Sequence, residues 1–286
     1  MTDKLSKSSL ANKTLLIFLW IIASLFVTSG LVKTVARQYF LIVKHVNISA
    51  RSFNENTANI STSLILNIVA ELLFFALLMI GNRLFFHIRI KLATRRFAWG
   101  LLYVLPICLF LIGNSVQAVN TVMHTTLDPT VTSLSIIFSL IVGLTEETAF
   151  RGIMLGNLLK HSNKSLSYYF VIVLVQGFFF GGLHLVNLGR QTFSVTFSQV
   201  IYASAIGIIF GVVYTKTGSL IITILAHALI DALAFIADPS AILAKNAATV
   251  PSATYLVMGG ILLFMIAYAA LTILLADKSK MTQIWQ

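Results

Sequence analysis

Charged residues are scarce in this sequence of 286 residues: they make up only 10% of it, whereas 58% of the residues are hydrophobic. A soluble domain of this size cannot cover its surface with so few charges. The hydrophobic residues also occur in long runs rather than in the stripes of amphipathic helices. The composition therefore excludes an ordinary soluble domain and predicts an all-α polytopic membrane protein.

Acidic residues and cysteine are scarcer still. Nine Asp and Glu stand against 20 Lys and Arg, which gives a formal net charge of +11. In a soluble protein this excess would suggest a nucleic-acid partner. Here the cations lie between hydrophobic runs, where they orient a chain on an anionic membrane face, so no nucleic acid is expected. The single cysteine, Cys108, excludes an internal disulfide.

Eight hydrophobic runs are long enough to cross a bilayer, at about 17–25 residues each. The expected spans cover residues 14–33, 62–81, 98–117, 131–150, 166–186, 196–215, 219–236 and 254–276. The fourth is expected to continue as a helix to Leu159. Residues 37–60 are expected to form a partly amphipathic connection on the membrane surface.

No internal repeat, low-complexity segment or soluble domain interrupts this pattern. We divide the chain into an N-terminal part with three spans and a basic loop (1–130), a core (131–236) and a C-terminal span (237–286), all within one membrane domain. The sequence does not indicate an oligomeric state.

The distribution of Lys and Arg predicts the topology. An even number of spans puts both termini on one side, and that side receives most of the 20 cations. The loop RLFFHIRIKLATRR, residues 83–96, is the strongest single signal, whereas residues 118–130 contain no Lys or Arg and fit the opposite side. The positive-inside rule therefore predicts a multi-pass protein of the cell membrane with both termini in the cytoplasm.

Seven ionisable residues lie inside or at the edges of the expected spans. A charge at the centre of a membrane helix costs about 2.5–3.5 kcal/mol on insertion scales, so such residues mark functional sites. The set comprises Glu71, Glu146, Glu147, Arg151, His184, His227 and Asp231. All except Glu71 fall in the fourth, fifth and seventh spans. Glu71 stands alone in the second, and no role is assigned to it.

The stretch EETAFR, residues 146–151, places two carboxylates next to each other. Glu147 and Arg151 are four residues apart, so on a helix they share a face and can pair. Glu146 points about 100° away from Glu147. The spacing favours a structural pair of Glu147 with Arg151 and leaves Glu146 for chemistry. The alternative is a buried ion network that only fixes helix packing.

Two further patterns place histidines at helical spacing. Phe180 and His184 share a face in FFFGGLH, beside the glycines 177, 181 and 182, which allow another helix to approach closely. His227 and Asp231 share a face in HALID, where the carboxylate could orient the imidazole. For each histidine, a purely structural hydrogen bond between or within helices is the alternative.

A glutamate, two histidines and an aspartate on three helices suit the activation of water for amide hydrolysis. A carboxylate can take the proton of water while imidazoles stabilise the oxyanion. The same residues, Glu146, His184, His227 and Asp231, also match zinc ligation with a water in the open position. The sequence contains no HExxH, GxSxG or GxGD motif. Both the metal-free and the zinc mechanism remain open at this stage.

The three motifs, E-E-x-x-x-R at 146–151, F-x-x-x-H at 180–184 and H-x-x-x-[N/D] at 227–231, resemble those of the CAAX-protease and bacteriocin-processing family, also called CPBP or Abi. The resemblance covers residues 131–236. It implies an eight-helix intramembrane endopeptidase whose site opens to the cytoplasm and whose substrate is a membrane-associated peptide or protein. Eukaryotic members cleave prenylated CAAX tails, and many bacterial members are linked to bacteriocin immunity or peptide maturation.

By this resemblance Glu146 activates water, with Glu147 and Arg151 as the structural pair beside it. Phe180 would line the site, His184 would hold the water, and His227 with residue 231 would face the scissile carbonyl. The eukaryotic pattern often has Asn where this chain has Asp231. Because an ionised Asp cannot donate to an oxyanion, Asp231 is expected to orient His227 or to bind zinc.

Two other functions are compatible with the same residues. A non-catalytic immunity or scaffold protein would use these helices to bind a bacteriocin or a membrane partner. A proton-coupled transporter would use the intramembrane Glu, His and Asp as a relay. Against a transporter, the ionisable groups gather near one face, and no paired interrupted spans indicate inverted repeats.

Overall fold

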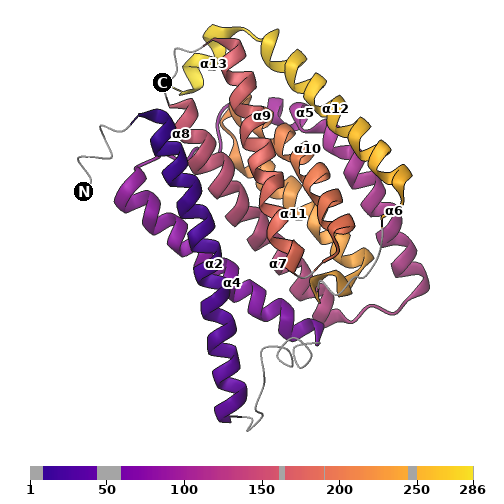
Figure 1. The fold of residues 1–286 in the computed structure, drawn as a ribbon. Helices are drawn as coiled ribbons and strands as arrows, with labels where there is room; N and C mark the ends of the chain where they lie inside the picture. Colours follow the sequence, from indigo (N-terminus) through magenta and orange to yellow (C-terminus); the bar gives the residue numbers. More distant parts are fainter. Residues whose placement is uncertain (1–8, 44–58, 161–164, 190, 244–249, 286) are drawn as a thin grey trace. The chain divides into compact units, whose positions relative to one another are not determined.

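The computed structural model describes residues 9–43, 59–160, 165–189, 191–243 and 250–285, and every regular element within them is a helix (Figure 1). The predicted all-α fold is confirmed. In this part of the chain, eight helices are long and apolar enough to cross a membrane. They cover Leu10–Ile42, Ile60–Phe86, Leu105–His124, Pro129–Leu159, Leu166–Gly189, Phe193–Thr217, Leu220–Ala237 and Ser252–Leu274.

The third span differs most from its prediction. Residues expected at its start form the separate helix α5 (Phe97–Tyr103), and a 3₁₀ turn, η2 (Leu105–Ile107), precedes α6 (Cys108–His124). Pro106 causes this break because proline disfavours helical geometry in the residue before it. The helix then continues to His124, so the expected loop at 118–130 is helical in its first half.

The chain folds into two compact units. The first comprises the described residues up to His87 together with Phe110–Glu146 and His227–Leu243. It contains α2 (Leu10–Val43), α4 (Ile60–Gly81), η1 (Asn82–Phe86), most of α6, α7 (Pro129–Glu147) as far as Glu146, the later part of α11 (Leu220–Ala237) and η5 (Pro239–Leu243).

Helix α2 packs across α4 in the first unit (Figure 1). The indole of Trp20 donates a hydrogen bond to the carbonyl of Leu77 at 3.2 Å and covers Gly81, where a side chain would collide with it. Helix α2 runs on to Val43, so the first part of the expected surface connection at 37–60 is wrong and belongs to this helix. Residues 44–58 of that connection lie outside the described residues.

The second unit comprises Ile88–Leu109, Glu147–Ala226 and the described residues from Val250 onward. It contains α5, η2, the π-helix η3 (Thr148–Leu155), α8 (Gly156–Leu159), α9 (Leu166–Gly182), η4 (Leu183–Gly189), α10 (Phe193–Thr217), the start of α11, α12 (Ser252–Leu274) and α13 (Lys278–Trp285). Helix α10 packs against both α9 and α12.

Glycines bring the backbones of α9 and α10 together. A β-carbon on Gly177 would lie 2.9 Å from the backbone nitrogen of Ile208, and one on Gly181 would lie 2.6 Å from the carbonyl oxygen of Val200. Both distances are too short for a side chain, so α9 needs glycine at these positions. Gly182, which was expected to belong to the same contact, has open space beside it.

Helix α12 exposes large apolar side chains on its surface. Leu256, Leu263 and Leu271 are 81%, 69% and 62% exposed. They lie seven and eight residues apart, so they form one stripe along the helix. Large apolar side chains with this exposure are costly in water but suit the hydrocarbon core of a bilayer.

Candidate functional site

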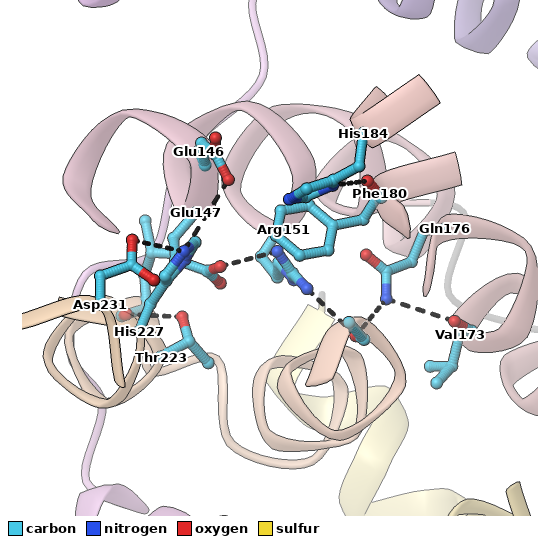
Figure 2. A network of polar contacts seen from close by, with 12 residues as sticks. Glu146, Glu147, Arg151, Val173, Gln176, Phe180, His184, Thr223, His227 and Asp231 are labelled. Atoms are coloured by element: carbon cyan, nitrogen blue, oxygen red, sulfur yellow. Dashed lines mark hydrogen bonds and ion pairs between the residues drawn. The ribbon is translucent and has the colours of Figure 1, made fainter. Parts of the chain in front are cut away.

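Three of the predicted site residues meet in the first unit. Glu146 ends the part of α7 in this unit, and His227 and Asp231 lie one turn apart on α11. Oε2 of Glu146 lies 3.8 Å from Nε2 of His227, and Oδ2 of Asp231 lies 3.5 Å from the same nitrogen. Figure 2 shows both carboxylates converging on the imidazole. Nε2 of His227 therefore lies close to the carboxylates of both Glu146 and Asp231.

The exposure of these side chains differs. The side chain of His227 is 9% exposed, whereas those of Glu146 and Asp231 are 29% and 28% exposed. Both separations exceed the usual 2.7–3.2 Å of a direct N–H···O hydrogen bond. Polar atoms at such distances are commonly bridged by water. The cluster thus presents two reachable carboxylates beside an imidazole that is held in place by its burial.

A hydrophobic cluster joins three helices of the first unit, α4, α7 and α11. Leu64 of α4 is buried together with Phe138 and Val142 of α7, and Ile68 and Phe235 pack against them. The rings of Phe138 and Phe235 lie 5.6 Å apart between their centroids. These contacts fix α4, α7 and α11 side by side.

Each of the three helices carries an ionisable residue about one helical turn away from this cluster. Glu71 follows Ile68 by three residues on α4, and Glu146 follows the last cluster residue of α7 by four. Asp231 precedes Phe235 by four residues on α11. Because residues three or four apart lie on the same face of a helix, the packing that aligns the apolar residues also brings Glu71 toward Glu146 and Asp231.

The carboxyl group of Glu71 lies inside the first unit. Its Oε2 atom is buried and has no hydrogen-bond partner among the described residues. The charges of Glu146, His227 and Asp231 all act on it. Sequence reasoning gave Glu71 no role because it stands alone in its span. The register of Glu71 could have indicated a role, because Glu71 lies on the same face of α4 as the apolar cluster.

The second unit holds the ion pair that the spacing favours. Nη1 of Arg151 donates to Oε1 of Glu147 at 2.7 Å, and both side chains are fully buried. A buried pair of this kind is strong only when its remaining polar atoms are satisfied. Nη2 of Arg151 donates to the carbonyl oxygen of Gly207 at 3.2 Å, and Nε2 of Gln176 donates to the same oxygen at 2.7 Å.

Aromatic rings enclose the guanidinium group. Its central carbon lies 4.3 Å from the centroid of the Phe180 ring and 5.3 Å from that of Phe210. Phe150 meets Phe180 edge to face at 5.2 Å. Cation–π contacts strengthen when they are removed from water. The phenylalanine of the second motif therefore supports the arginine of the first (Figure 2).

A π-helix, η3, carries most of the EETAFR motif. It begins at Thr148, directly after Glu147, runs to Leu155, and is buried throughout. The helix is expected to continue to Leu159 and does so, but with this wider stretch inside it. π-helical turns are rare and are often found at functional sites. The π-helix begins between Glu147 and Arg151 and includes Arg151.

His184 lies just beyond the end of α9, in the 3₁₀ segment η4. Its Nδ1 atom lies 3.4 Å from the carbonyl oxygen of Phe180, and the two rings are 5.9 Å apart at an edge-to-face angle. A proton on Nδ1 would point at that carbonyl and would make Nε2 the acceptor of the ring. The side chain is half-buried.

The structure thus places the predicted residues in two sets. Glu146, His227 and Asp231 meet in the first unit, with Glu71 added; Glu147, Arg151, Phe180 and His184 belong to the second. The peptide bond between residues 146 and 147 connects them. Of the two adjacent carboxylates, Glu147 is fully buried against Arg151, whereas Glu146 is accessible.

Zinc ligation requires several donor side chains around one point. Among the described residues, no group of three or more His, Cys, Asp or Glu is arranged so that it could hold a metal ion.

Comparison with known proteins identifies the segment that contains the three motifs. Residues 128–233 match the family model described as type II CAAX prenyl endopeptidase Rce1-like. The matched stretch begins at the start of α7 and ends on α11, just beyond Asp231. The resemblance to the CAAX-protease family is therefore confirmed for this segment. No curated protein and no solved structure matches the chain.

Proposed function

With residues 128–233 assigned to the Rce1-like CAAX endopeptidase family, we propose that this chain hydrolyses a membrane-associated peptide or protein inside the membrane, with Glu146 as the base that activates water. The observation that carries the proposal is the contrast between the two adjacent glutamates. Glu147 is committed to Arg151, whereas Glu146 is accessible and faces His227. Of these two glutamates, Glu146 is therefore the one that can take a proton from water.

The proposed reaction uses the groups of the first unit directly. Glu146 removes a proton from a water molecule while the water oxygen attacks the scissile carbonyl carbon. The single Nε2–H of His227, which faces Asp231 before the reaction, donates to the oxyanion as it forms. Glu146 then passes its proton to the leaving nitrogen as the C–N bond breaks, which yields one carboxylate and one amine. Asp231 keeps the His227 ring oriented.

The role of His184 is proposed from the resemblance of the three motifs, in their order along the chain, to those of the family. We assign it to holding the attacking water or the substrate carbonyl. The contact of Nδ1 with the Phe180 carbonyl supports this assignment, because it sets which ring nitrogen can accept a proton. The substrate is expected to be a peptide or protein that reaches the site from the membrane, as in peptide maturation or bacteriocin immunity.

The test is the cleavage of membrane peptides by the purified full chain carrying Glu146→Gln. We expect kcat to fall by about 10²–10⁴-fold, the usual contribution of a general base. Asp238→Asn is the matched control, because it also turns a carboxylate into an amide on the loop directly after α11. Full cleavage by Glu146→Gln would exclude the proposal. Protection against a bacteriocin that survives this change would favour a binding protein.

Zinc dependence is tested in the same assay. We propose the metal-free route, so cleavage by wild-type protein should persist after treatment with a chelator and dialysis. Loss of cleavage that added zinc restores would instead establish the metal mechanism. A matched measurement with an unrelated zinc protease in the same detergent confirms that the chelator acts under these conditions.

A further inference from the structure

A second polar cavity lies in the second unit, away from the motif residues. It has a volume of about 430 Å³ and is formed by α5, the end of α10, the turn after α12, and α13. Its charged lining residues are Arg96, Lys216, Asp277 and Lys280. Three cations and one carboxylate leave an excess of positive charge, which no function described above uses.

The single carboxylate of this lining, Asp277, already has its own partners. Asp277 accepts hydrogen bonds from the backbone nitrogen and the hydroxyl of Ser279, at 2.9 and 2.7 Å, and lies 3.7 Å from Nζ of Lys280. The Ser279 hydroxyl is the main reason that the pKa of Asp277 lies below its ordinary value, so this carboxyl is ionised at neutral pH. Asp277 therefore compensates Lys280.

Arg96 and Lys216 provide the remaining positive charge, and the charges of both Arg96 and Asp277 act on the Lys216 ammonium. Nζ of Lys216 donates to the carbonyl oxygen of Thr272 at 3.1 Å and lies 5.2 Å from the centroid of the Tyr103 ring. These contacts fix the ammonium group but do not neutralise it. An ammonium has three N–H donors, and the Thr272 carbonyl accepts one. The arrangement suits an anion with several acceptor oxygens.

Apolar side chains border the same cavity. Trp99 and Leu275 line it and are 59% and 79% exposed. Lys216 lies near the end of one candidate span, and Leu275 directly follows another, so the cavity sits where spans end. Tryptophan and tyrosine prefer this interfacial level of a membrane. A ligand that combines an anionic head with apolar chains would satisfy the whole lining.

We propose that this cavity binds the phosphate group of an anionic phospholipid. Arg96 and Lys216 would contact the phosphate oxygens, and the acyl chains would follow Trp99 and Leu275. The distribution of Lys and Arg assigns this end of the chain to the cytoplasmic side, whose leaflet carries anionic lipids. The proposal does not depend on peptidase activity, because none of these residues belongs to the motifs.

The test uses the full chain in nanodiscs of phosphatidylcholine with a minor fraction of phosphatidylglycerol, and native mass spectrometry counts the retained phosphatidylglycerol. The pocket variant is Arg96→Gln/Lys216→Gln. The control variant Arg95→Gln/Lys278→Gln removes the same charge from neighbouring positions that do not line the cavity. We expect the pocket variant to lose affinity by about 10- to 30-fold and the control by about twofold or less.

Two outcomes would overturn the proposal. Equal losses in the pocket and control variants would show that phosphatidylglycerol responds only to the overall charge. A second arm adds inorganic phosphate or glycerol 3-phosphate to nanodiscs of phosphatidylcholine alone; if either raises the Tm as much as phosphatidylglycerol does, the ligand is a soluble phosphate compound. If the double variant does not fold, Arg96→Gln alone is used, with an expected loss of about fivefold.

Discussion

The guanidinium carbon of Arg151 lies 4.3 Å from the centre of the Phe180 ring, so the first and second motifs of the chain are in direct contact. The ring covers a charge that is completely buried and that also pairs with Glu147. From sequence, Phe180 was expected to line the site. The structure shows that its ring packs on the ion pair, which explains why an aromatic residue stands one turn before His184.

Replacement of this ring should weaken the fold of the second unit. Phe180→Leu removes the cation–π contact and leaves part of the space around Arg151 unfilled, for an expected loss of about 2–4 kcal/mol of unfolding free energy. Thermal unfolding in detergent would measure it. Phe179→Leu, at the adjacent and 41% exposed position, is the control and should change Tm little. Equal Tm values for both variants would contradict the assignment.

The Glu147–Arg151 pair should show the asymmetry of a buried ion pair. Glu147→Gln or Arg151→Met alone leaves one buried charge without its partner, at a cost of about 3–5 kcal/mol. The double variant Glu147→Gln/Arg151→Met removes both charges and should recover part of that stability. Unfolding of the four proteins forms a double-mutant cycle. Additive losses in this cycle would mean that the two charges do not stabilise each other.

Asp231→Asn should retain more peptidase activity than Asp231→Ala. An asparagine keeps a carbonyl oxygen that can accept a hydrogen bond from Nε2 of His227, whereas alanine leaves the ring without this support. We expect losses within about tenfold for Asn and up to about a hundredfold for Ala, in the range of groups that orient a functional histidine. Steady-state cleavage rates decide the point, and equal losses in the two variants would show that Asp231 acts through its negative charge.

Glu71→Leu should stabilise the protein and lower its activity at the same time. Removal of a buried carboxyl oxygen that has no hydrogen-bond partner should raise Tm by a few degrees, because such a group costs about 1–3 kcal/mol. Cleavage should fall by about tenfold or more, because the charges of the Glu146 cluster act on this carboxyl. Such opposite changes are typical of functional positions. Unchanged cleavage in Glu71→Leu would assign Glu71 to packing alone.

The predicted topology can be tested through the single cysteine. In a Cys108→Ala background, Ser279→Cys should react with an impermeant maleimide only from the cytoplasmic side, and Thr126→Cys only from the opposite side. Both positions are exposed. Intact cells and inverted vesicles supply the two sides. Labelling of Ser279→Cys in intact cells would reverse the orientation.

The spans were predictable because the thickness and the apolar interior of the bilayer set the length and the hydrophobicity of a spanning helix. The third span begins later than expected because the helix breaks at Pro106, and the presence of this proline in the sequence would have indicated the break. The spacing of Glu147 and Arg151 was enough to suggest their contact. The place of Glu71 was only partly predictable: its register continues the apolar face of α4, but its neighbours depend on how α4 packs against α7 and α11. The common acceptor at Gly207 O is likewise a tertiary feature, since Arg151 and Gln176 reach it from different helices.

The π-helical stretch at 148–155 has a consequence for insertions and deletions. A π-helix closes its hydrogen bonds over five residues instead of four, so it accommodates extra chain within an otherwise α-helical span. Deletion of one residue among Thr148, Ala149 and Phe150 would favour ordinary α-helical winding and would turn Arg151 relative to Glu147 by about 100°. Among related chains, a one-residue gap in this stretch would therefore disrupt the motif more severely than most point substitutions.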